Sequence, residues 1–157
     1  MDKVIDLHAH VVLEESFGSA GEYGPSLNDD IGVQTFRVGY YSMRVPYRGS
    51  VFMDAQTRID AMDVLGIDLQ VLSPNPLTFF GHIDEKNATR FARSSNDAMV
   101  SHINRFPNRL LGTASVPLQN TDYACEELVR AVDEPVSYTH LRAHETLRYL
   151  VCRLLLE

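Results

Sequence analysis

The sequence predicts an α/β fold in which parallel strands alternate with helices. Strand-type patterns occur at residues 3–10, 68–72 and 110–116, and helical apolar spacing occurs between and after them. Strands that alternate with helices favour parallel pairing through right-handed crossovers. Three such βα units begin either a doubly wound sheet or a (β/α)8 barrel. A complete barrel needs about 250 residues, so the 157-residue chain is too short to close one.

The first strand, residues 3–10, has two chemically different faces because side chains alternate along a strand. One face carries the apolar residues Ile5, Leu7 and Ala9. The other face carries Asp6, His8 and His10. The segment 14–50 then shows no sustained periodicity, apart from a hairpin expected around 36–44. Loops of this length are uncommon and are often functional, so we interpret 14–50 as an insertion over one end of the fold.

The first helix is predicted to begin after an Asp54 N-cap and to stop at Gly66. Its apolar stripe is Ala55, Ile59, Met62 and Leu65. A short strand at 68–72 follows, and we expect Pro74 and Pro76 to prevent further helix or ladder pairing there.

The second helix is predicted over 84–106, with an apolar stripe at three- and four-residue steps. The stripe comprises Ala88, Phe91, Ala92, Ser95, Met99, His102, Ile103 and Phe106. We expect His102 to be a satisfied core histidine. A third strand should span 110–116, and Asn120 or Thr121 should cap a third helix. Its apolar stripe is Ala124, Leu128, Ala131 and Val132.

The last residues, 135–157, break the pattern because a fourth strand is due there. Their string, PVSYTHLRAHETLRYLVCRLLLE, resembles the accidental translation of a sequencing adapter. We therefore divide the chain into a fold-bearing part, 1–134, and an artefactual tail, 135–157. On this interpretation His140, His144 and Cys152 carry no functional weight.

The pair His8 and His10 is the most informative motif for chemistry. Imidazoles at i and i+2 on one strand point the same way, and both can reach one divalent ion by bending inward. The pair ends the first strand, and α/β folds place active sites at the carboxyl ends of strands. An ordinary pair of histidines on a half-exposed strand is the alternative. Asp6 either orients one of these ligands or is polar filling.

Several segments in this order resemble the amidohydrolase superfamily, specifically its amidohydrolase-2 branch. The matching segments are VIDLHAH before a long insertion, FRV at 36–38, RIDAMD at 58–63, QVLSPNP at 70–76, and FPNRL at 106–110 with VPLQ at 116–119. The resemblance implies a metal-dependent (β/α)8 barrel of which 1–134 is the N-terminal part, about three βα units. It also implies decarboxylation of a small unsaturated or aromatic carboxylic acid.

The resemblance further implies a catalytic divalent metal, usually zinc, held by His8 and His10. In this family the other ligands are a histidine after the fifth strand and an aspartate after the eighth, and a histidine after the sixth handles the proton. All three would lie beyond residue 134, so we expect this polypeptide itself to be inactive. Three other functions stay open: a hydrolase or hydratase of the same family, a metal-dependent nuclease of the TatD type, and a non-catalytic, aggregation-prone fragment.

A carboxylated substrate requires a cation, and the resemblance aligns Arg37 with a substrate-carboxylate arginine of the branch. A solvated arginine in a polar loop is the alternative. Phe79, with Phe80 and His82 as weaker candidates, follows the second strand and is predicted to line the substrate pocket. Packing of this loop against its own helix is the alternative.

The composition excludes several classes of function. The net charge is −7, from 14 basic and 21 acidic residues. The chain therefore has no excess of basic residues to bind nucleic-acid phosphates, which disfavours the nuclease. No secretory signal and no membrane-spanning run are visible. Two cysteines are too few for a disulfide framework, so a reduced cytoplasmic protein is the simplest interpretation. The family resemblance favours a homodimer.

Overall fold

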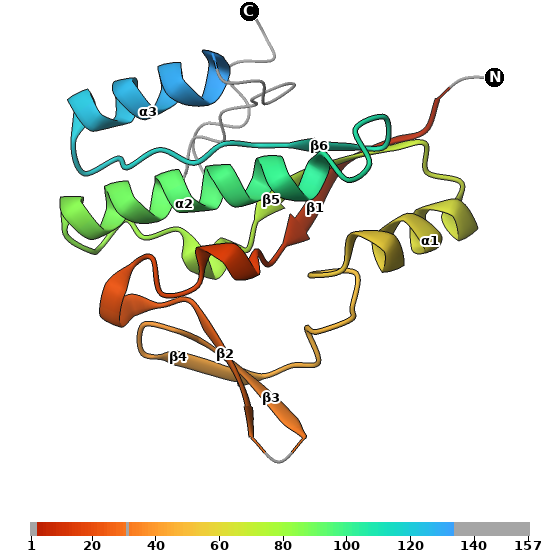
Figure 1. Ribbon diagram of the computed structural model, residues 1–157, viewed down its shortest axis with the longest axis horizontal. Helices are drawn as coiled ribbons and strands as arrows, with labels where there is room; N and C mark the ends of the chain where they lie inside the picture. Colours follow the sequence, from red (N-terminus) through yellow and green to blue (C-terminus); the bar gives the residue numbers. More distant parts are fainter. Residues whose placement is uncertain (1–2, 31, 134–157) are drawn as a thin grey trace, which may run out of the picture.

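The first sheet has three parallel strands, and it confirms the predicted βα organisation. A computed structural model describes residues 3–30 and 32–133. Strand β1 (Ile5–Val11) pairs with β5 (Leu69–Pro74), and β5 pairs with β6 (Leu110–Gly112). The sheet order is therefore β1-β5-β6, with a helix in each connection (Figure 1). The predicted tail 135–157 lies outside the described residues.

The insertion between β1 and the first helix folds into a second sheet. This antiparallel sheet has the order β2-β3-β4, with β2 (Ser26–Asp30), β3 (Val33–Val38) and β4 (Tyr41–Arg44). The expected hairpin is β3–β4, whereas β2 was not predicted. Two short 3-10 helices, Glu14–Ser16 and Gly21–Tyr23, precede β2. In Figure 1 this sheet lies at the end of the molecule opposite the last helix.

Helices α1 (Ala55–Leu65) and α2 (Glu85–Ile103) connect the strands of the first sheet, α3 (Thr121–Asp133) packs on α2, and the predicted caps of α1 and α3 are confirmed. Helix α1 begins after Asp54, whose carboxylate accepts the Thr57 N–H, and ends at Gly66 in the left-handed conformation. Helix α2 begins after Asp84, and α3 follows Asn120, whose side chain accepts the Tyr123 N–H at 3.1 Å. Within 3–30 and 32–133, no helix combines the length and apolar character needed to cross a membrane.

Two apolar clusters form the core on either side of the β1–insertion junction. One cluster packs β1, β5 and β6 against α1 and α2, and its central residues are Val11, Leu72, Met62, Met99 and Leu110. The other packs the second sheet against the start of α2, around Phe36, Val38, Phe80 and Phe91. Both clusters include residues next to the end of β1, so that end is held between the two sheets.

Two strand ends differ from the prediction for identifiable reasons. Strand β5 continues to Pro74, opposite Val11, because the following residue, Asn75, supplies the N–H that bonds the Val11 carbonyl at 3.0 Å. The second proline lies in a 3-10 turn, Pro76–Thr78, at a position where a helix needs no N–H. Strand β6 stops at Gly112, not at residue 116, because the Asn96 side chain bonds both the N–H and the carbonyl of Ser115.

The predicted apolar stripes are correct for α2 and only partly correct elsewhere. The α2 stripe is buried from Ala88 to Ile103. On α1, the predicted stripe residue Leu65 is exposed, whereas Arg58, which was not assigned to the stripe, is buried. On α3, Val132 is exposed, and the fully buried residue is Glu127. On β1, Leu7 of the apolar face is 75% exposed in the described chain.

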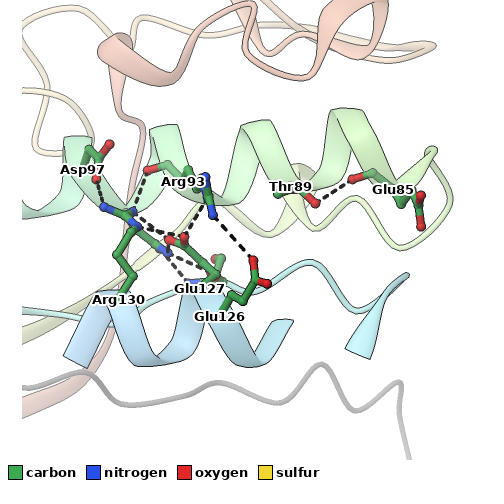
Figure 2. Close-up of polar contacts among 9 residues, drawn as sticks. Glu85, Thr89, Arg93, Asp97, Glu126, Glu127 and Arg130 are labelled. Carbon is green, nitrogen blue, oxygen red and sulfur yellow. Dashed lines mark hydrogen bonds and ion pairs between the residues drawn. The ribbon is translucent and has the colours of Figure 1, made fainter. Parts of the chain in front are cut away.

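Polar contacts join α3 to α2 where the stripe of α3 was expected to be apolar. The Glu127 carboxylate lies 2.7 Å from Arg130, 3.3 Å from Arg93 and 2.7 Å from the Asn96 amide (Figure 2). Arg130 also bonds Asp97 on α2 at 2.8 Å, and these two carboxylates hold the Arg130 pKa above its ordinary value. Paired charges therefore replace apolar packing at the centre of this helix contact.

Candidate metal centre at the end of strand β1

His8 and His10 lie side by side on one face of β1. Their ring centroids are 4.9 Å apart and the rings meet edge to face, at 78°. His8 is exposed and His10 is half-buried. Imidazole nitrogens bind zinc at about 2.0–2.1 Å, so rings at this spacing fit a shared cation. Among the described residues, however, no group of three or more His, Cys, Asp or Glu side chains forms a complete metal centre.

The histidines lie at an irregularity in the β1–β5 ladder. The pairing register shifts between Asp6 and Ala9, and this interval contains His8. The His8 N–H donates to the Asp6 carboxylate at 3.0 Å. That bond, followed by the bond from the Gln70 side chain, holds the pKa of Asp6 below its ordinary value. Bulges are common next to active sites, where they re-aim a side chain.

Two buried polar side chains, Arg58 of α1 and Gln70 of β5, connect to this part of β1. Gln70 donates to the second Asp6 oxygen at 2.7 Å and accepts from Arg58 at 2.6 Å. Arg58 also donates to the His10 carbonyl oxygen at 2.6 Å. Burial lowers the pKa of Arg58 to about 10, partly opposed by the Asp6 charge, so the guanidinium stays protonated at neutral pH.

Ser73 of β5 contacts the ring of His10. Its hydroxyl oxygen lies 2.9 Å from His10 Nδ1 and 3.3 Å from the Ala9 carbonyl oxygen. When the hydroxyl donates to Ala9, its oxygen accepts Nδ1–H, and His10 then presents Nε2 as the lone-pair donor. Bonds of this kind to the other ring nitrogen commonly fix the tautomer of a metal-binding histidine.

Arg37 lies on β3 in the second sheet. Its side chain is exposed, and Nε donates to the Gly39 carbonyl oxygen at 3.1 Å, within its own hairpin. The predicted role of Arg37 as a substrate-carboxylate ligand stays a prediction.

The residues after β5 have different environments. Phe79 is half-buried at the end of the 3-10 turn, and its predicted place in a pocket wall stays a prediction. Phe80 is buried and packs edge to face on Phe91 of α2, with centroids 4.8 Å apart. The loop therefore packs against its own helix at Phe80, which was the alternative interpretation. His82 is exposed, with its ring centroid 6.1 Å from that of Tyr23.

His102 is buried as expected, with 9% of its surface exposed, but it is not fully satisfied. Its Nε2 has no hydrogen-bond partner among the described residues. The side chain lines a polar hollow of about 250 Å³ between the start of α1 and the end of α2. Burial, with the nearby Arg58 and Arg105 charges, lowers its pKa to about 4.

Arg58, Gln70 and Ser73 lie near the histidines, and the sequence assigned no role to any of them. Arg58 does carry a signal, because it lies on the buried stripe of α1, three residues after Ala55 and four before Met62. A charged side chain at such a position requires a polar partner inside the fold. Which partner it finds depends on the distance between α1 and β5, which periodicity does not provide.

The comparisons with known proteins place this chain beside decarboxylases. No family model matches the sequence. The chain is 34% identical over 129 residues to gamma-resorcylate decarboxylase of Rhizobium radiobacter, covering 82% of this chain and 36% of that protein. It is 26% identical over 136 residues to 2-amino-3-carboxymuconate-6-semialdehyde decarboxylase of Dictyostelium discoideum, covering 83% of this chain and 37% of that protein.

A solved structure agrees with these relatives. The dihydroxybenzoic acid decarboxylase of Polaromonas sp. JS666, with bound manganese and the inhibitor 2-nitroresorcinol, matches with a TM-score of 0.59 and 26% identity. The match covers 85% of this chain and 36% of that one. The chain thus spans about 36% of the length of its relatives, and its three-strand parallel sheet corresponds to part of their barrel.

Proposed function

We propose, starting from the kinship of this chain with the decarboxylases of the amidohydrolase family, that it supplies the β1 side of a divalent-cation centre in a non-oxidative decarboxylase. The substrate class is a small aromatic or unsaturated carboxylic acid. The observation that carries the proposal is the pair of imidazole rings, 4.9 Å apart, at the carboxyl end of β1. We assign His8 and His10 as ligands of one cation, which we take to be zinc or manganese.

The donor chemistry supports this assignment. Imidazole is a good ligand for zinc and other first-row metals, and carboxylates extend the choice to manganese. When the Ser73 hydroxyl donates to the Ala9 carbonyl oxygen and accepts Nδ1–H, His10 presents Nε2 to a cation. A divalent cation in this position supplies electrostatic stabilisation for the negative charge that develops as a carboxylate leaves as CO₂.

We assign Arg37 to the substrate carboxylate and Phe79 to the wall of the pocket. Arg37 is exposed, and its planar guanidinium has the donors for a two-point contact with a carboxylate. Lysine keeps the charge but not this geometry. In the complete enzyme, Arg37→Lys should therefore raise KM about tenfold with a smaller change in kcat.

The test uses the complete protein encoded by the natural gene that carries residues 3–133. Its sequence should contain a histidine after the fifth strand and an aspartate after the eighth. Purified with its metal, it should convert 2,6-dihydroxybenzoate or a related aromatic acid to the decarboxylated product. His10→Ala should abolish this turnover. Hydrolysis of lactones or amides without CO₂ release would identify a hydrolase of the same family and would reject the decarboxylase.

A further inference from the structure

A continuous set of hydrogen bonds starts at the His8 N–H, leaves β1 through the Asp6 side chain and returns to β1 at the His10 carbonyl. The His8 N–H bonds Asp6, Asp6 bonds Gln70, Gln70 bonds Arg58, and Arg58 bonds the His10 carbonyl, at distances of 2.6–3.0 Å. Arg58 is 5% exposed and Gln70 is 8% exposed, so water competes weakly for these bonds. The set therefore ties the backbone on both sides of the histidine pair to α1 and β5.

The ladder alone does not fix this part of β1. The register shift between Asp6 and Ala9 interrupts the β1–β5 pairing where His8 lies. At a bulge, the side-chain direction depends on the local backbone, and an unpaired backbone group needs another partner. The Asp6 carboxylate is that partner for the His8 N–H.

The direction of every bond in the set is determined. Arginine only donates and an ionised carboxylate only accepts. Gln70 must therefore turn its oxygen toward Arg58 and its NH₂ group toward Asp6, as the 2.6 Å and 2.7 Å contacts require. If one group in the set changes from acceptor to donor, or from donor to acceptor, one contact joins two donors or two acceptors. Rotating the Gln70 amide by 180° moves this mismatch to another contact but does not remove it.

We propose that Arg58, Gln70 and Asp6 act as positioning residues that hold the His8 and His10 rings side by side for one cation. None of the three is assigned as a ligand. The inference rests on the proposed function for the role of the cation, but the ring placement is testable without metal. It predicts that the pattern of donors and acceptors, not the net charge, is what the site requires.

Two single variants and their combination test this pattern. In Asp6→Asn, an amide that still accepts the His8 N–H presents its NH₂ group to the Gln70 NH₂ group. In Gln70→Glu, two carboxylates face each other. In the double variant Asp6→Asn/Gln70→Glu, the new carboxylate at position 70 accepts from Arg58 and from the new amide at position 6, whose oxygen accepts from His8. The double variant thus restores every bond at unchanged net charge. Gln56→Glu, on the exposed side of α1, is the matched control for the added charge.

The metal-independent measurement is the nuclear Overhauser effect between the two imidazole rings in the full chain. Rings 4.9 Å apart should show it in the wild type, in Gln56→Glu and in the double variant. Each single variant should lose at least half of its intensity. Retention in both single variants, or no recovery in a double variant whose circular dichroism matches the wild type, would overturn the inference.

The second measurement is Zn²⁺ affinity, made with His140 and His144 replaced by alanine so that the tail contributes no imidazole. Both single variants should bind about tenfold or more weakly, as expected when an outer-shell partner is lost, and the double variant should return to within about threefold of wild type. Charge alone predicts instead that Gln70→Glu binds more tightly. Wild-type affinity in both single variants would reject the positioning role and keep the cation site. The nuclear Overhauser effect between the two rings could instead follow the pattern of donors and acceptors while no variant binds Zn²⁺. That result would reject the cation site and keep the positioning role.

Discussion

At the scale of single residues, the shared face of His8 and His10 was predictable from strand alternation. A period of two directs both side chains to one face, but the register shift at His8 leaves the exact ring directions to contacts outside the ladder. The roles of Arg58 and Gln70 were not predictable in the same way. Their contacts depend on a bulge in β1 and on how closely α1 approaches β5, and both are tertiary features.

The buried imidazole of His102 predicts a specific pH dependence of stability. Its pKa is about 4 in the folded protein and about 6.5 in an unfolded chain. The unfolded state therefore binds more protons between these values, so the free energy of unfolding falls as the pH drops from about 6.5 to about 4. The loss should be on the order of 2–3 kcal/mol. Urea unfolding at pH 7 and pH 4.5 measures it.

The variant His102→Gln should flatten this dependence, since glutamine does not titrate. His82→Gln, at an exposed position, should keep it. The carboxyls of Asp6, Asp54 and Asp84 have lowered pKa values, so their contributions are lost only below about pH 4. An equal slope in His102→Gln and wild type would contradict the burial of a neutral imidazole.

At the scale of elements, the helices were easier to predict than the ends of the strands. Caps such as Asp54 and the stripe of α2 are local signals, and both are confirmed. The end of β6 depends on a side chain 19 residues away, because Asn96 takes the backbone groups of Ser115. The three-stranded insertion sheet likewise depends on pairing between Leu27 and Phe36, which sequence periodicity did not indicate.

The contact between α2 and α3 depends on one buried charge. Glu127 is fully buried and contacts Arg93 and Arg130 (Figure 2). Its carboxylate also accepts from the Asn96 amide. Glu127→Ala leaves these donors without their shared acceptor, which should lower the free energy of unfolding by about 3 kcal/mol. Glu126→Ala, one residue away and exposed, removes only a 4.0 Å contact and should cost less than about 0.5 kcal/mol. Equal losses in urea denaturation of the two variants would show that burial does not distinguish them.

At the scale of the whole molecule, the alternation of strands and helices was sufficient to predict a parallel sheet. The parallel pairing, the helix in each connection and the position of the insertion after β1 agree with that prediction. The sequence places the apolar residues of β1 on one face, and two of them, Ile5 and Leu7, are exposed in the described chain. Burial of a strand face depends on what packs over it, and the pattern of β1 alone does not specify the covering element.

The account depends on one cation shared by His8 and His10, and a calorimetric titration tests this most directly. The complete protein, which supplies the ligands expected beyond residue 134, is titrated with Zn²⁺ and, separately, with Mn²⁺. One ion per chain should bind, and His8→Ala or His10→Ala should each weaken binding at least tenfold, while His82→Ala should leave it unchanged. Absence of binding by either metal, or equal binding by the His8 and His10 variants and the parent chain, would contradict the account.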